Sequence, residues 1–241
     1  RMNNEIELIL FDLDNTLYPF NKYWNNANKE VFKEFDYTKN LEYEEFNRML
    51  IYYDEYYWVQ HDSGQITLDQ LRYLRLIKTL ETFNINISYE EAKKYFATFF
   101  NYILSYITPD YELIELLNIL KNYKKIGILT NGKILEQREK IRRLDFEKTF
   151  DGNVYISEEI NIEKPDKKSF QYVAKAFKVS VENTLFIGDS LHNDVLGSLS
   201  AGMKPIWLTS ENDLEGYQID DVEIYNDDIK SLVMKLIEEY K

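Results

Sequence analysis

A short apolar run near the start of the chain ends abruptly in two aspartates. Residues 6–11 read Ile-Glu-Leu-Ile-Leu-Phe, and Asp12 and Asp14 follow at once. Bulky and β-branched side chains over so few residues predict a strand that helices cover on both faces. Open α/β sheets bind their ligands outside the carboxyl ends of such strands. Asp12 and Asp14 therefore lie where a ligand site is expected, although a solvated Asx turn has the same pattern.

Length and charge narrow the classes of partner. The 241 residues are enough for one large domain or two small ones, and the composition is that of an ordinary globular protein. The formal net charge of -13 argues against a nucleic acid polymer or an anionic membrane surface as the main partner. A local basic site for a small anionic ligand remains compatible with that charge.

The chain contains no cysteine, which excludes disulfides, thiolate nucleophiles and cysteine metal sites and fits a reducing compartment. No apolar run approaches the roughly 20 residues that span a bilayer, and the N-terminal residues lack a signal-peptide pattern. We therefore expect a cytoplasmic protein that does not insert into membranes.

Residues 19–107 form a polar and aromatic block with helical spacing, bracketed by Pro19 and Pro109. Thr67 with Gln70, and Ser88 with Glu91, match the capping box at a helix start. One expected apolar face comprises Leu68, Leu71, Leu74, Ile77 and Leu80, and another comprises Tyr95, Phe96, Phe99, Phe100 and Ile103. The block predicts an inserted all-α domain of about four helices.

The rest of the chain alternates strands with helices. Strands are expected at residues 125–129, 153–156, 184–187 and 204–208, and helices are expected from Pro109 to about Tyr123 and from Lys133, Asp166, Asn193 and Asp227. This alternation predicts an α/β fold whose core, a Rossmann-like parallel sheet with helices on both faces, comprises residues 1–18 and 108–241. Residues 211–221 are acidic and are expected to form a surface loop.

Four expected strand ends carry polar motifs. They read Phe-Asp-Leu-Asp-Asn-Thr at 11–16, Ile-Leu-Thr-Asn-Gly at 128–132, Glu-Lys-Pro-Asp at 163–166, and Ile-Gly-Asp-Ser-Leu-His-Asn-Asp at 187–194. In this order the motifs strongly resemble those of the haloacid dehalogenase-like hydrolase superfamily. The resemblance covers the sheet domain, and the helical block is similar only in kind to the cap that this family inserts after its first strand.

The resemblance implies roles for the two aspartates. Asp12 would attack phosphorus and form an aspartyl-phosphate that water later hydrolyses. A carboxylate stays ionised for this purpose when a metal and a lysine lie close to it. Asp14 would protonate the leaving oxygen and then accept a proton from the attacking water.

The resemblance also implies a phosphate site and a magnesium site. Thr130 would donate a hydrogen bond to a phosphoryl oxygen, helped by backbone N–H groups around Asn131 and Gly132, and Lys164 would supply a positive charge. The Mg²⁺ ligands would be Asp12, the backbone carbonyl of Asp14, and Asp189, with Asp194 completing or supporting the set. Ser190 and Asn193 would contact these ligands without binding the metal ion themselves.

Each motif also has an ordinary structural explanation. Thr130 to Gly132 suits a turn, Lys164 suits a solvated charge, and Asp194 suits a helix cap. Four such motifs at strand ends in one order make coincidence the weaker explanation. A serine-hydrolase dyad of Ser190 and His192 is rejected because the chain has no Gly-x-Ser-x-Gly elbow.

In the helical block we expect His61 and the nearby aromatic run to be ordinary residues of the bundle and its core rather than ligands. That run comprises Tyr52, Tyr53, Tyr56, Tyr57 and Trp58. Some cap residues must nevertheless select the substrate. The candidates are Tyr23, Trp24, Tyr53, Tyr57, Arg72 and Arg75.

Asp14 favours a phosphatase. In the superfamily that this chain resembles, dehalogenases have the first aspartate but typically lack the second, and phosphonate-cleaving members likewise have another residue at the second position. We therefore expect a magnesium-dependent phosphomonoesterase for a small phosphorylated metabolite, such as a nucleoside monophosphate or a sugar phosphate. Phosphoglucomutase-like phosphoryl transfer is one alternative, because such members keep both acids. A non-catalytic protein that binds a phosphorylated ligand is the other.

Overall fold

The computed structural model describes residues 5–209 and 219–241. The chain divides into two compact units, one formed by Arg1–Phe20 with Ile107–Lys241 and the other by Asn21–Tyr106. We call the first unit the core and the second the cap. That the two units are separate domains, with the boundaries expected from the sequence, stays a prediction.

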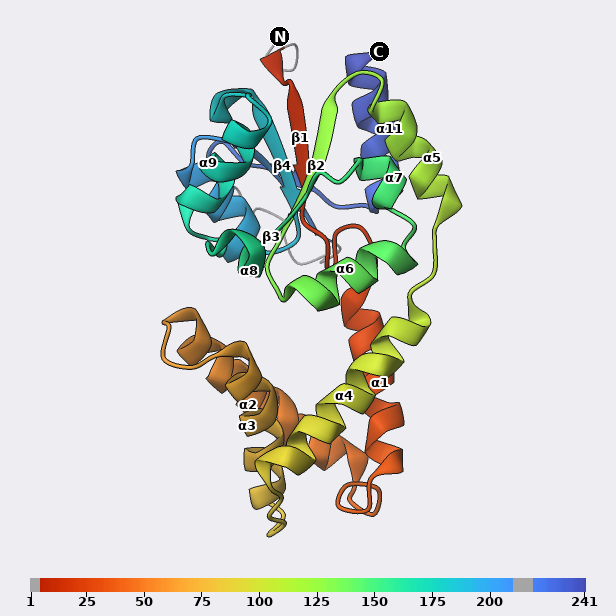
Figure 1. The fold of residues 1–241 in the computed structure, drawn as a ribbon, viewed down its shortest axis with the longest axis vertical. Coiled ribbons are helices and arrows are strands. Elements are labelled where there is room, and N and C mark those ends of the chain that lie inside the picture. The colour runs from red at the N-terminus through yellow and green to blue at the C-terminus, as the bar shows by residue number, and fades with distance from the viewer. Residues whose placement is uncertain (1–4, 210–218) are drawn as a thin grey trace. The chain divides into compact units, whose positions relative to one another are not determined.

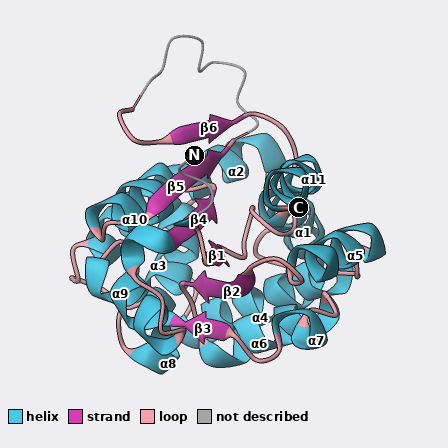
Figure 2. Cartoon of the chain, turned by 90° about the horizontal axis from the view of Figure 1, so that it is seen from above, coloured by secondary structure: helices cyan, strands magenta, loops and turns pink. Residues whose placement is uncertain are grey.

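The core is built on a six-stranded parallel sheet with the strand order β3-β2-β1-β4-β5-β6 (Figures 1 and 2). The central strand β1, with every residue buried, pairs with β2 and β4 on either side. The expected α/β fold is therefore confirmed. The strands are β1 (Leu8–Phe11), β2 (Lys125–Thr130), β3 (Val154–Ile156), β4 (Thr184–Gly188), β5 (Lys204–Leu208) and β6 (Glu223–Tyr225).

Helices cover both faces of the sheet. Figure 2 shows α8 (Ser157–Ile160), α9 (Lys167–Ala176) and α10 (Gly197–Ser200) on one face, and α5 (Tyr111–Leu120), α7 (Glu147–Phe150) and α11 (Ile229–Tyr240) on the other. Helix α6 (Ile134–Arg143) follows β2, and two further turns are η2 (Val181–Asn183) and η3 (Leu191–Leu196). Between the sheet and α9 lies a cluster of fully buried side chains that includes Leu8, Leu10, Leu129, Phe170, Val173 and Phe186.

Several boundaries in the core differ from the sequence predictions. Helix α5 begins at Tyr111 rather than in a first turn at Pro109, because the Asp110 side chain caps it through the Leu113 N–H. The helix expected from Asn193 begins instead as the π-turn η3, capped by Ser190. The short edge strand β6 was not expected. Of the expected acidic loop, residues 211–218 lie outside the described residues, and Asp220 and Asp221 are exposed.

The cap consists of α1 (Phe20–Glu34), α2 (Tyr43–Asp62), α3 (Leu68–Glu81) and α4 (Tyr89–Tyr106), as the prediction of about four helices requires. Both predicted capping boxes are confirmed. The Thr67 hydroxyl accepts from the Gln70 N–H at 3.1 Å, and the Gln70 side chain accepts from the Thr67 N–H at 2.9 Å. Ser88 and Glu91 make the same reciprocal pair at 3.1 and 2.7 Å. These bonds satisfy N–H groups that a helix start leaves without partners.

The buried faces of the cap helices follow the predicted stripes only in part. On α4, Tyr95, Phe99 and Ile103 are buried. On α3, Leu71 and Leu80 of the predicted stripe are buried, whereas Leu68, Leu74 and Ile77 are only half-buried. The residues that α3 buries are Leu71, Tyr73, Arg75, Leu76, Thr79 and Leu80.

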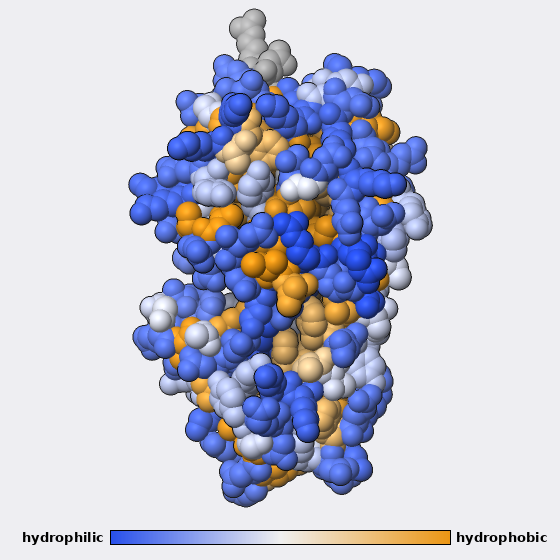
Figure 3. Space-filling model, viewed as in Figure 1, coloured by the Kyte–Doolittle hydropathy of each residue, from blue (hydrophilic) through white to orange (hydrophobic). Residues whose placement is uncertain are grey.

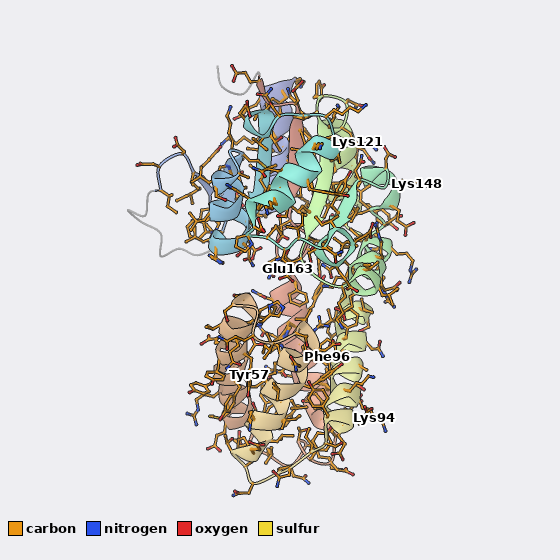
Figure 4. All side chains as sticks on the ribbon, turned by 60° about the vertical axis from the view of Figure 1, so that its left-hand side comes forward. Tyr57, Lys94, Phe96, Lys121, Lys148 and Glu163 are labelled. Atoms are coloured by element: carbon orange, nitrogen blue, oxygen red, sulfur yellow. The ribbon has the colours of Figure 1, made fainter. Side chains whose placement is uncertain are left out.

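The aromatic run on α2 does not belong wholly to the bundle core. Tyr57 is buried, whereas Tyr52 is 59% exposed, Tyr56 51% and Trp58 39%. Neighbouring residues on a helix are about 100° apart, so such a run cannot face one side. In Figure 4, Tyr57 and Phe96 are labelled among the cap helices, together with the exposed Lys94.

One face of the molecule is drawn with its hydropathy in Figure 3. The face shown in Figure 3 is mostly hydrophilic with scattered apolar patches, which agrees with the net charge of -13. Among residues 5–209 and 219–241, no helix combines the length and the apolarity that a bilayer crossing requires.

Candidate active site

The turn after β1 brings Asp12 into position. The Asp12 N–H donates to the Ile187 carbonyl at 2.9 Å, which ties the end of β1 to β4. Asn15 then adopts a left-handed conformation with φ of 62°, which asparagine tolerates better than most residues. The chain turns back as a result, and the Thr16 hydroxyl lies 3.4 Å from Asp12 Oδ2.

Three aspartates converge at this edge of the sheet. Asp12, Asp189 and Asp194 each offer a carboxylate oxygen, and these oxygens all lie within 4.8 Å of one another. Gly188 makes the approach possible, because a Cβ there would lie 2.4 Å from the Asp194 side chain. Carboxylate oxygens are the donors that a hard divalent cation prefers, so the set fits a metal ion.

Lys164 lies between two of these carboxylates. Its Nζ is 2.8 Å from Asp12 Oδ1 and 2.7 Å from Asp194 Oδ1, and the residue is only 4% exposed. Burial by itself lowers the pKa of the lysine, but the charges of Asp12 and Asp194 outweigh it and raise that pKa. Lys164 is therefore a fixed positive charge beside Asp12.

Asn131 holds the segment that carries Lys164. Its side-chain amide donates to the Lys164 carbonyl at 2.9 Å, and its side-chain oxygen accepts from the Lys164 N–H at 2.9 Å. The side chain of Asn131 thus braces the lysine, and the Gly132 N–H donates to the Ser157 hydroxyl at 2.9 Å. In this structure Asn131, which was expected to help bind phosphate, makes its side-chain hydrogen bonds to the backbone of Lys164.

The acidic cluster resists full ionisation. Burial, followed by the charges of Asp12 and Asp194, raises the pKa of Asp189 from 3.8 to about 8. Burial and the charge of Asp12 likewise raise the pKa of Asp194 to about 6. One positive charge from Lys164 does not compensate three carboxylates, and a metal ion would supply the missing charge.

These raised pKa values predict how metal-free stability depends on pH. The folded state holds protons that the unfolded chain releases near pH 4, so the free energy of unfolding falls as pH rises from about 4 to about 8. We expect Mg²⁺ to raise the Tm more at pH 8.5 than at pH 6, because at pH 6 it must displace protons.

The measurement is thermal unfolding in EDTA and in Mg²⁺ at both pH values. Asp189→Asn serves as the control, because it should weaken the pH dependence of the metal-free protein. An equal Tm shift by Mg²⁺ at pH 6 and pH 8.5 would contradict the expectation.

The Asp14 carboxylate does not join the acidic cluster. Its Oδ1 accepts from Lys140 Nζ at 2.9 Å and from the Tyr18 hydroxyl, and its Oδ2 accepts from Gln137 Nε2 at 3.0 Å. Burial acts to raise the pKa of Asp14, but Lys140, Tyr18 and Gln137 together lower it. The backbone carbonyl of Asp14 stays the predicted metal ligand.

Gln137 and Lys140 are residues that the sequence analysis missed. Both lie on α6 and are buried, with exposures of 2% and 4%. A usable signal was their spacing with the buried Ile141, since positions i, i+3 and i+4 share one face of a helix.

Thr130 lies at the end of β2, the strand beside β1, and is 1% exposed. The hydroxyl accepts from Gln137 Nε2 at 2.8 Å. The structure therefore links Thr130 to Asp14 through Gln137, and it links Asp12, Lys164 and Asp194 directly.

Ser190 and His192 make no catalytic pair. The Ser190 hydroxyl accepts from the Asn193 N–H at 3.1 Å, and His192 is exposed. The Ser190 N–H donates to Asp194 Oδ2 at 3.1 Å, and the Trp207 indole donates to the Asp189 carbonyl at 2.9 Å. Both bonds steady the acidic cluster.

The cap candidates lie in the bundle as follows. Arg75 is buried, with Nη1 2.8 Å from Asp54 Oδ1, and the Arg72 guanidinium lies 4.3 Å from the Phe96 ring centre. Tyr57 is buried, and the Trp24 ring packs edge-on against Phe99. A role of Tyr23, Tyr53 or any of these residues in substrate selection stays a prediction. His61, with its ring against Trp58, is a half-buried bundle residue.

Comparison with known proteins identifies the family of this chain. Residues 6–202 match the family model of the haloacid dehalogenase-like hydrolases. The chain belongs to this family. The resemblance inferred from the sequence motifs is thereby confirmed, and the protein is a hydrolase.

Relatives and solved structures extend the comparison. The chain is 31% identical over 209 residues to the pyrimidine 5'-nucleotidase YjjG of Escherichia coli, covering 85% of this chain and 86% of that protein. It is 29% identical over 229 residues to a glyceraldehyde 3-phosphate phosphatase of Methanopyrus kandleri, covering 90% and 91%. The magnesium-bound crystal structure of the HAD-hydrolase YfnB of Bacillus subtilis shares the fold, with a TM-score of 0.78, 21% identity, and 96% and 98% coverage.

Proposed function

We propose that this hydrolase is a magnesium-dependent phosphomonoesterase acting through an aspartyl-phosphate on Asp12. The observation that carries the proposal is the position of the Asp12 carboxylate, 2.8 Å from Lys164 Nζ and grouped with Asp189 and Asp194. A carboxylate held among fixed charges at a sheet edge suits attack on phosphorus.

In the first step an Asp12 carboxylate oxygen bonds to phosphorus and the ester P–O bond breaks. Lys164 and the Thr130 hydroxyl hold the phosphoryl oxygens, whose negative charge they offset. Mg²⁺ bound by Asp12, Asp189, Asp194 and the Asp14 carbonyl would supply further positive charge at the phosphoryl group. The leaving oxygen takes a proton from Asp14.

In the second step water attacks the phosphorus of the aspartyl-phosphate, and Asp14 takes its proton. The acyl-phosphate P–O bond breaks, which restores the Asp12 carboxylate. The lowered pKa of Asp14 means that the carboxylate is ionised and can accept this proton. Its role as an acid requires a proton, and the negative charge of a bound phosphoryl group raises the pKa of a neighbouring carboxyl group in that direction.

The names of the relatives guide the choice of substrate. One relative is named a pyrimidine 5'-nucleotidase and the other a glyceraldehyde 3-phosphate phosphatase. We propose a small phosphorylated metabolite, either a nucleoside monophosphate or a sugar phosphate, as the substrate of this chain. A cytoplasmic location stays a prediction from the sequence.

The test is phosphate release from a panel of pyrimidine and purine nucleoside monophosphates, sugar phosphates and glyceraldehyde 3-phosphate, with Mg²⁺ or with EDTA. We expect release only with Mg²⁺ and a marked preference within the panel. Binding of these esters without release would instead favour the non-catalytic alternative. Interconversion of sugar phosphate isomers would favour the mutase.

Replacing Asp14 should affect esters unequally. We expect Asp14→Asn to lower kcat/KM more for an alkyl phosphate than for p-nitrophenyl phosphate, because a poor leaving group needs the proton more. A difference of about tenfold or more is expected from the usual size of acid catalysis. The quantity to compare is kcat/KM, which reports the first chemical step. An equal loss for both esters would rule out the general-acid role.

A further inference from the structure

Gln137 makes a bridge between the two residues expected to act on either side of the phosphoryl group. Its Nε2 lies 3.0 Å from Asp14 Oδ2 and 2.8 Å from Thr130 Oγ1. The residue is 2% exposed. One buried amide group thus contacts both the expected acid–base residue and the expected phosphate-binding hydroxyl.

The orientation of this amide follows from its partners. An ionised carboxylate only accepts hydrogen bonds, so the Gln137 atom facing Asp14 must be the nitrogen. The same nitrogen faces Thr130, and its second hydrogen must be accepted by the Thr130 oxygen. Thr130 therefore keeps its own proton for another acceptor, and in the structure that acceptor is the Asn131 carbonyl at 3.4 Å. A bond of that length is weak and easily exchanged for a better one.

An ionised phosphoryl oxygen also only accepts hydrogen bonds. Thr130 can bind it only as a donor. Because the Thr130 oxygen already accepts from the Gln137 amide, its own proton is directed away from that amide. The same amide donates to the Asp14 carboxylate, so one group fixes the hydrogen bonding of both residues.

Gly132 provides the space for this arrangement. Its φ is +144°, and a Cβ on it would lie 3.0 Å from Gln137 Cδ and 3.1 Å from Gln137 Cγ. The glycine of the Thr-Asn-Gly motif therefore leaves room for the Gln137 side chain. This observation does not depend on how the amide is oriented.

We propose that Gln137 is a positioning residue, which makes Thr130 a one-way hydrogen-bond donor to the transferred phosphoryl group and holds Asp14 in register with it. The inference rests on the proposed function, because it takes Thr130 as the phosphate ligand. Gln137 itself does not touch the substrate. Its effect is transmitted through Thr130 and Asp14.

The experiment is a double-mutant cycle of Gln137→Met and Thr130→Val, read out by kcat/KM for p-nitrophenyl phosphate and by calorimetric binding of inorganic phosphate in Mg²⁺. Methionine keeps the length of the side chain and removes the donors. We expect Gln137→Met to weaken phosphate binding and kcat/KM by about tenfold, the value of one charge-assisted hydrogen bond. In phosphate binding, the double variant should be little worse than Thr130→Val alone, because both changes act on the same hydrogen bond to phosphate.

Gln171→Met is the matched control, since Gln171 lies exposed on α9. Gln137→Glu should be more harmful than Gln137→Met, because it places an acceptor and a like charge beside Asp14. Thermal unfolding shows whether each variant is folded. If Gln137→Glu is unfolded, Gln137→Met alone tests the inference.

Wild-type behaviour of Gln137→Met, or losses in phosphate binding that add in full to those of Thr130→Val, would overturn the inference while leaving the proposed phosphatase intact. If the native protein hydrolyses no ester, the proposed function fails but the phosphate-binding cycle still tests Gln137. A native protein that neither hydrolyses esters nor binds phosphate overturns both.

Discussion

Asp12→Asn is expected to abolish ester hydrolysis, with a loss of about 10⁴-fold or more in kcat, as is usual when a covalent nucleophile is removed. The asparagine has nearly the same shape as the aspartate but cannot form the aspartyl-phosphate. The assay is phosphate release in Mg²⁺ with the best ester from the panel.

The loss of activity in Asp12→Asn should not result from unfolding of the variant. Asp12 is one of three clustered carboxylates, and its charge helps to raise the pKa of Asp189 and of Asp194. Removing one of these charges relieves repulsion, so metal-free Asp12→Asn should unfold at a Tm no lower than that of the native protein at pH 8. Asp110→Asn is the matched control, because asparagine caps a helix as well as aspartate does. An Asp12→Asn protein with more than a tenth of native activity would exclude Asp12 as the nucleophile.

Lys164→Met is expected to damage both activity and stability. The lysine is buried between Asp12 and Asp194, and its loss leaves carboxylates in the cluster without their positive partner. Breaking a buried pair in this way costs about 3–5 kcal/mol of unfolding free energy. We also expect kcat to fall by about 10³-fold, because the variant lacks a charge that stabilises the phosphoryl group.

The pH dependence identifies the cause of the instability. Lowering the pH protonates Asp189 and Asp194, whose pKa values are raised to about 8 and about 6, so the stability deficit of Lys164→Met should shrink from pH 8.5 to pH 5. Denaturant unfolding in EDTA at both pH values measures it. The exposed Lys175→Met on α9 is the control. A deficit independent of pH would point to lost packing instead of unpaired charge.

Much of the core followed from the sequence because its strands and motifs are local features. The apolar run before Asp12 and the polar residues that follow it are visible in a few consecutive letters. Edge strand β6 was missed because its three residues, one exposed and two half-buried, carry no such pattern. In the cap, the sequence favours the bundle core for the aromatic run on α2, whereas Tyr52 and Tyr56 are exposed in the structure. Residue type had outweighed helical geometry in that interpretation.

The contacts of Asp14, the proposed acid–base residue, could not be predicted in the same way. Asp14 is separated from Gln137 and Lys140 by more than 120 positions, and only the packing of α6 brings them together. A glutamine and a lysine in a helix with many charges normally face solvent, so their types argue against burial. Their burial is explained by Asp14, because a buried carboxylate requires hydrogen-bond donors and both residues donate to it. The motifs thus predicted the reacting groups, whereas the buried partners of Asp14 became visible only in the structure.

The most direct test of the proposed mechanism is to trap the phosphoryl group on the protein. Asp14→Asn lacks the base for the second step, so a single turnover quenched with acid should show one added phosphoryl mass on the peptide that contains Asp12. The same experiment with the variant carrying both Asp12→Asn and Asp14→Asn should show none. If Asp14→Asn completes a turnover and no phosphorylated protein appears at any time, the aspartyl-phosphate mechanism is contradicted.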